Sequence, residues 1–161
     1  MLYFLPIDSV EEAANDRLSK EGLLREPPNV DFRVGNFRVL PWEDASFNTV
    51  IDIESLYANK MVDIRACVTE IQRVLKPGGF FFGKLFGEQT TGNHSGEKIE
   101  PGTFLKLTIG PCAGNDISHF FKREELEELF SEFRELSIDQ SFRTDHNGNV
   151  EIFEWVVSAR I

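Results

Sequence analysis

The sequence predicts an α/β fold in which a mostly parallel sheet ends in an antiparallel hairpin. Strand-like apolar runs alternate with segments of helical spacing, which is the pattern of crossover connections between parallel strands. Phe47–Ile53 is almost wholly apolar, as expected for a strand buried on both faces. Asn147-Gly148 lies between the last two strand-like runs and is a strong hairpin signal.

Local patterns predict the individual elements. The expected strands are Leu2–Ile7, Val30–Val34, Phe47–Ile53, Gly79–Phe86, Leu136–Arg143 and Val150–Ala159. Helical spacing predicts one helix that ends near Gly22, one along Met61, Ile64, Val68, Ile71 and Leu75, and one along Leu126, Leu129, Phe130 and Phe133. Gly87–Ser118 has no clear period, and we expect a long loop with a short strand at Phe104–Thr108.

Composition indicates one soluble globular domain spanning residues 1–161. The formal net charge of −10 disfavours nucleic acid as a partner, because like charges repel. Cys67 and Cys112 have no metal-ligand spacing and suit a reducing cytoplasm, so no metal site is expected. No apolar run is long enough to span a membrane, and the N-terminus does not have the pattern of a signal peptide.

Two sequence stretches carry a family resemblance. LPWEDASFNTVIDIESLY, followed by EIQRVLKPGGFFF, resembles the class I S-adenosylmethionine-dependent methyltransferases. Asn48 departs from the Asp that the family usually has there. PIDSVEEAANDRLSKEGL resembles the second strand and following helix of that family, and the likeness is weakest across Gly87–Ser118. The resemblance implies a Rossmann-like class I methyltransferase sheet.

The family's first strand and glycine-rich cofactor loop have no counterpart here, since no G-x-G-x-G occurs in the sequence. Aligned on Asp8, the domain is expected to be N-terminally truncated. The missing strand is central in the family's sheet. Its neighbours could pair directly, a second copy could supply a strand in a swapped homodimer, or another polypeptide could complete the sheet.

The resemblance assigns cofactor contacts to several residues. Asp8 would accept hydrogen bonds from the ribose diol, although Asp there also suits a helix N-cap. Asn36 would hydrogen-bond the adenine and Phe37 would pack against it. Alternatively, Asn36 belongs to a turn and Phe37 to the core.

Asp52, Ile53 and Glu54 end the third predicted strand and would line the methionine end of the cofactor and the methyl acceptor. A buried Asp52 carboxylate needs a donor, which could be a ligand ammonium, a backbone amide or a lysine.

Two further residues are candidates for catalysis. Tyr57 would border the acceptor pocket or simply pack. His119 is a candidate general base or pocket residue, but a histidine before a helix also serves for capping or packing.

The sequence therefore predicts methyl transfer from S-adenosylmethionine to a small-molecule acceptor by direct displacement, with Gly87–Ser118 as a lid or pocket wall. The alternative is a non-catalytic remnant of the fold that serves as an oligomeric binding or scaffold module. Because the glycine loop is absent from the sequence, we expect weak or undetectable cofactor binding and little methyl transfer by this chain alone.

Overall fold

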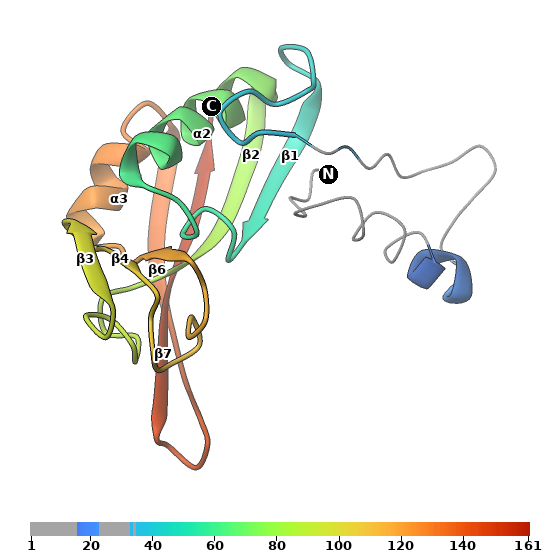
Figure 1. Ribbon diagram of the computed structural model, residues 1–161. Coiled ribbons are helices and arrows are strands. Elements are labelled where there is room, and N and C mark those ends of the chain that lie inside the picture. The colour runs from blue at the N-terminus through green and yellow to red at the C-terminus, as the bar shows by residue number, and fades with distance from the viewer. Residues whose placement is uncertain (1–15, 23–32, 34) are drawn as a thin grey trace.

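A computed structural model describes residues 16–22, 33 and 35–161 (Figure 1). The strands are β1 (Phe47–Ile53), β2 (Leu75–Phe86), β3 (Glu97–Glu100), β4 (Thr103–Leu105), β5 (Ile117–His119), β6 (Arg134–Asp145) and β7 (Val150–Arg160). The helices are α2 (Met61–Val74) and α3 (Arg123–Leu129), and residues 16–20 are also helical. The predicted strand Leu2–Ile7, nearly all of Val30–Val34, and Asp8 lie outside the described residues.

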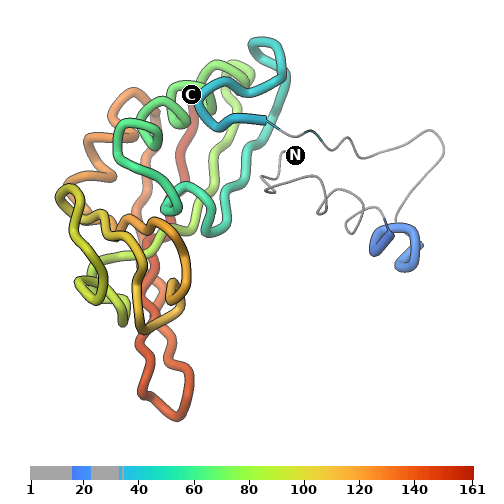
Figure 2. The backbone as a smooth tube through the Cα atoms, in the orientation of Figure 1, coloured from blue at the N-terminus to red at the C-terminus, as the bar shows by residue number. Residues whose placement is uncertain are grey.

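The main sheet is mixed, with the strand order β1-β2-β7-β6. β1 and β2 are parallel, whereas β7 runs antiparallel to both β2 and β6. The predicted α/β class and the C-terminal antiparallel hairpin are therefore confirmed. Figure 2 shows this hairpin extending beyond the rest of the chain.

Helices α2 and α3 are held by apolar residues at helical spacing. Ile64, Val68 and Ile71 of α2 are buried in the main core, together with Leu126 of α3. Just after α3, the ring of Phe130 stacks on Phe81 of β2 with 5.0 Å between centroids. One face of the sheet is thus closed by the two helices that the sequence pattern predicts.

The glycine pair after α2 belongs to a strand, which corrects the prediction that β2 starts at Gly79. β2 begins at Leu75, which pairs with Phe47 before the register shifts. Gly78 has φ +75, and a Cβ on Gly79 would lie 2.7 Å from the Lys76 carbonyl oxygen. Only glycine tolerates both constraints, so the chain turns sharply and still continues the pairing.

The segment predicted as a long loop contains a second sheet, which is a further correction. β3, β4 and β5 form an antiparallel sheet in that order, and β4 ends at Leu105 instead of continuing to Thr108. Its residues pack on a separate core made of Phe86, Phe104, Leu107, Cys112, Phe120 and Ile152. Strands of three or four residues are too short to show a period in the sequence.

Arg73 and Glu70 bind the chain segment that leads into β1. The Arg73 guanidinium donates to the carbonyl oxygens of Leu40 (3.1 Å) and Trp42 (2.8 Å) and to Asp44 Oδ1 (2.9 Å). Glu70 Oε2 accepts the Leu40 N–H at 2.8 Å and an Arg73 N–H at 2.7 Å. The two stretches that carry the family resemblance are therefore hydrogen-bonded to each other.

Replacing Arg73 with Lys should lower the free energy of unfolding by about 1–3 kcal/mol. A lysine keeps the charge, but it cannot donate to both carbonyls and both carboxylates at once. The control is Arg65→Lys, because Arg65 on the same helix pairs only with exposed Glu128 among the described residues. Urea denaturation measures the free energy of unfolding of the wild type and the two variants. An equal loss of stability in both variants would contradict this role of Arg73.

Candidate functional site

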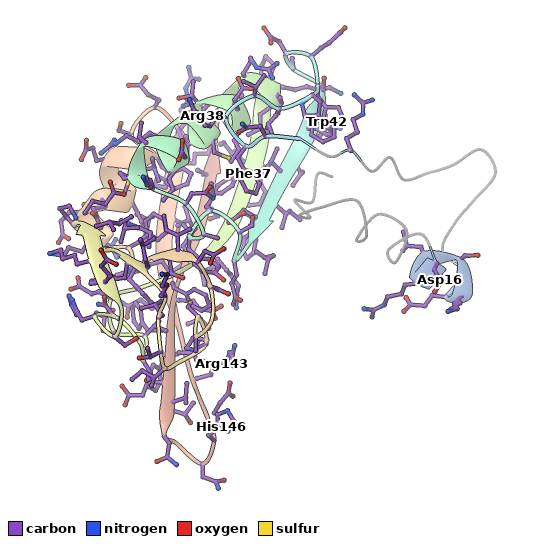
Figure 3. The ribbon with its side chains drawn as sticks, viewed as in Figure 1. Asp16, Phe37, Arg38, Trp42, Arg143 and His146 are labelled. Atoms are coloured by element: carbon purple, nitrogen blue, oxygen red, sulfur yellow. The ribbon has the colours of Figure 1, made fainter. Side chains whose placement is uncertain are left out.

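The carboxyl ends of β1 and β2 form one edge of the main sheet, where open α/β sheets bind ligands. Arg38 Nη1 lies 3.4 Å from Asp63 Oδ1 in the first turn of α2. That ion pair places the 36–39 turn beside the start of α2, at the same edge. Figure 3 shows Phe37 and Arg38 near α2, well separated from Arg143 on the hairpin.

Asn36 and Phe37 both make contacts within the protein. The Asn36 side-chain oxygen accepts the Arg38 N–H at 2.9 Å, and its carbonyl accepts the Val39 N–H at 2.9 Å. Phe37 is half-buried against the main core. Asn36 thus has the contacts of a turn residue and Phe37 those of a core residue, which are the alternatives given above. The Asn36 side chain is exposed to solvent.

Asp52 is 1% exposed and finds its hydrogen-bond donors in its own chain. The Ser55 hydroxyl donates to Asp52 Oδ1, and the Leu56 N–H lies 3.3 Å and 3.4 Å from the two carboxylate oxygens. Burial raises the pKa of Asp52 to about 6, and these hydrogen bonds oppose the rise. The Leu56 backbone amide is one of the donors considered above, and the Ser55 hydroxyl is an additional one. Together they fix the turn after β1.

Ile53 and Glu54 are the more accessible residues at this strand end. Ile53 is 49% exposed, and Glu54 is half-buried with φ +54. The Glu54 N–H donates to the Lys84 carbonyl oxygen at 3.0 Å, which holds this backbone conformation. Burial and the neighbouring Glu154 carboxyl raise the pKa of Glu54 to about 7.

Lys84 and Glu154 also lie at this site, although neither was among the predicted site residues. Glu154 is 1% exposed, and its Oε2 lies 2.9 Å from Lys84 Nζ. Lys84 is the one charged residue in GFFFGKLF, and Glu154 lies in the middle of VEIFEWVV, between Phe153 and Trp155. That pattern was a usable signal, because a charge in a buried strand requires a partner.

Tyr57 connects the turn after β1 to the small sheet. Its hydroxyl accepts a hydrogen bond from the Asn115 side-chain amide at 2.9 Å, and its ring packs edge-on against Phe86. The Tyr57 carbonyl oxygen accepts the His119 N–H at 2.8 Å. Burial raises the pKa of Tyr57 to about 12, so its hydroxyl is a poor proton donor at neutral pH.

His119 is fully buried beside Tyr57. Its Nδ1 lies 2.7 Å from the Thr103 hydroxyl, which donates to Glu100 Oε1 at 3.0 Å. Because the hydroxyl proton goes to the carboxylate, His119 Nδ1–H must donate to Thr103, which leaves a lone pair on Nε2. That Nε2 has no hydrogen-bond partner in the described residues, and Glu125 Oε2 lies 3.8 Å away. Burial lowers the pKa of His119 to about 4.

The candidate site residues therefore form two groups. Ile53 and Glu54 lie at the carboxyl end of β1 near Lys84 and Glu154, whereas Tyr57 and His119 connect the turn after β1 to the small sheet. The ionisable Glu54 carboxyl thus lies at the carboxyl end of β1, and neutral His119 holds the small sheet beside it.

Neutral His119 should make stability depend on pH. In the unfolded chain a histidine takes up its proton near pH 6.5, whereas the folded protein resists protonation until about pH 4. Folding stability should therefore fall by on the order of 3 kcal/mol as pH drops through this window. His119→Gln should flatten this slope, and exposed His146→Gln should not. Denaturation at several pH values tests this, and equal slopes in all three proteins would contradict it.

Comparisons of sequence support one family. Residues 6–83 match a methyltransferase domain. A probable phthiotriol/phenolphthiotriol dimycocerosates methyltransferase of Mycobacterium ulcerans (strain Agy99) is 37% identical over 54 residues, which cover 34% of this chain and 20% of the relative. The match thus spans about a fifth of the length of that curated relative.

Solved structures show the same fold. A methyltransferase from Methanosarcina mazei aligns with TM-score 0.66 and 24% identity, over 83% of this chain and 68% of that one. The Burkholderia thailandensis 1,6-didemethyltoxoflavin-N1-methyltransferase was solved with bound 1,6-didemethyltoxoflavin and S-adenosylhomocysteine. It aligns with TM-score 0.58 and 16% identity, over 91% of this chain and 55% of that one. Residues 6–83 therefore match the methyltransferase domain family, and the fold of the chain is that of the class I S-adenosylmethionine-dependent methyltransferases.

Proposed function

We propose that this chain functions as an S-adenosylmethionine-dependent methyltransferase that acts on a small molecule. The observation that carries the proposal is the accessible carboxyl end of β1, where exposed Ile53 is the last residue of the strand and half-buried Glu54 follows it. The family match and the methyltransferase structures support this assignment.

The residues at this edge suit the cofactor. Exposed Ile53 and half-buried Phe37 offer apolar side chains, and the exposed Asn36 amide offers polar groups. Asp8, for which we propose the ribose contact, lies outside the described residues. When bound, S-adenosylmethionine supplies the methyl group. The chain's own part is to orient the acceptor and exclude water, which a direct displacement requires.

Asp52, Tyr57 and His119 are positioning residues in this proposal. Asp52 fixes the turn after β1 through Ser55 and Leu56. Tyr57 and His119 connect that turn to the small sheet, so β3, β4 and β5 form a wall beside the acceptor. Neither side chain has a pKa suited to exchanging protons near neutral pH.

We also propose that the protein is cytoplasmic and forms a homodimer. Within the described residues, no helix is long and apolar enough to cross a membrane. Cys67 and Cys112 are both buried and free of disulfides, which fits the reducing cytoplasm that we propose. Within the same residues β1 pairs with β2 alone, and we expect its other edge to favour a homodimer.

Binding of S-adenosylhomocysteine tests the cofactor site. We expect weak binding, with NMR shift changes at Ile53 and Glu54 as the ligand is raised to about millimolar concentration, where roughly −4 kcal/mol of binding free energy is detectable. Ile53→Glu should weaken binding at least tenfold, because it places a charge against the apolar part of the ligand. The matched control is Phe142→Glu on β6, since Phe142 is 59% exposed and β6 is the last strand in the order β1-β2-β7-β6.

The outcomes separate the two candidate functions. Shift changes confined to the β1 edge, lost in Ile53→Glu and kept in Phe142→Glu, would support a cofactor site. An unchanged spectrum would contradict the proposal and favour the non-catalytic remnant. Identical affinity in both variants would show that the ligand binds elsewhere.

A further inference from the structure

Three charged side chains converge on one face of the main sheet at its ligand-binding edge. Lys84 pairs with Ile53 across β1 and β2, and Glu154 pairs with Phe86 across β2 and β7. Lys84 and Glu154 are thus diagonal neighbours on adjacent strands, with 2.9 Å between Nζ and Oε2. The Glu54 N–H donates to the Lys84 carbonyl oxygen at 3.0 Å, and the charges of Glu154 and Lys84 both act on the Glu54 carboxyl.

Glu54 and Glu154 are neighbouring carboxyl groups that shift each other's pKa. Ionising two adjacent carboxyl groups together is unfavourable, so one of them keeps its proton to a higher pH. Glu54 and the Lys84 ammonium, which lies 2.9 Å from Glu154 Oε2, lower the pKa of Glu154 and keep it ionised. Burial and the neighbouring Glu154 raise the pKa of Glu54 to about 7, so Glu54 is the one of the two that takes up a proton first.

Only Glu54 of this pair can meet a ligand. Glu154 is 1% exposed, whereas Glu54 is half-buried beside the exposed side chain of Ile53. Glu54 also has φ +54, a conformation that non-glycine residues adopt rarely and at a cost in energy. Such strained residues are concentrated at functional sites.

We propose that Glu54, held by Glu154 and Lys84, accepts the proton that the methyl acceptor loses. This inference rests on the proposed function and defines the substrate class as small molecules with a weakly acidic O–H or N–H group. In the step, the O–H or N–H bond of the acceptor breaks and its electron pair stays on that atom. The proton forms an O–H bond with a Glu54 carboxylate oxygen.

The other groups around the cluster are compatible with this role. From β6, Ser141 hydrogen-bonds to Glu154, and Arg143 lowers the pKa of Glu54 through its charge. Arg143 also pairs with Asp145 at 2.8 Å, which offsets part of its charge. A base that titrates near neutral pH is half-ionised where the protein works, which is the optimum for proton transfer.

The first experiment measures the titration of Glu54 directly. Carboxyl carbon NMR of the whole chain should show a Glu54 midpoint near pH 7, and Glu154→Gln should lower it by at least one pH unit. The control Glu151→Gln, an exposed position on the same strand, should leave the midpoint unchanged. A wild-type midpoint near 4.3, the ordinary glutamate value, would overturn the proposal.

The second experiment uses turnover, with catechol and imidazole as acceptor probes and S-adenosylhomocysteine formation as the signal. Glu54→Gln should reduce kcat about 100-fold and remove the rise in rate between pH 6 and pH 8. Unchanged turnover in Glu54→Gln would overturn the inference and leave the proposed function standing. Failure of S-adenosylhomocysteine to bind the chain would instead count against the proposed function, while the Glu54 midpoint still decides the inference.

Discussion

The hydrogen bonds of Arg73 and Glu70 determine where β1 begins. They hold Leu40, Trp42 and Asp44 along α2, and the Ala45 N–H adds a bond to the Arg73 carbonyl oxygen at 2.9 Å. With the entry fixed, β1 runs from Phe47 in register with β2, and its carboxyl end falls at Ile53. The position of Glu54, and thus of the candidate site, depends on this connection.

Sequence patterns predicted the elements that are long and periodic. Phe47–Ile53 was predicted with its observed bounds, because a continuous apolar run between polar segments has few other structures open to it. Helix α2 followed from apolar residues on one face. The small sheet was missed, because its shape comes from packing against Phe86 and Ile152, which no local pattern reveals.

The candidate site was predicted in part for the same reason. Ile53 and Glu54 could be located because they follow a predicted strand. The partners of Glu54 could not, since Lys84 and Glu154 lie 70 residues apart in sequence and meet only through the order of the strands. The opposite holds for His119: its sequence context indicated possible chemistry, but burial and Thr103 give it a structural role.

In the function proposed for this chain, ligands bind at the carboxyl end of β1, with Glu54 facing them. A crystal structure of the chain with S-adenosylhomocysteine is the decisive measurement. We expect the ligand against Ile53, with the Glu54 carboxyl within hydrogen-bonding distance of Glu154 and beside the thioether sulfur. A ligand bound elsewhere on the chain, or a Glu54 carboxyl turned into solvent away from Glu154, would contradict it.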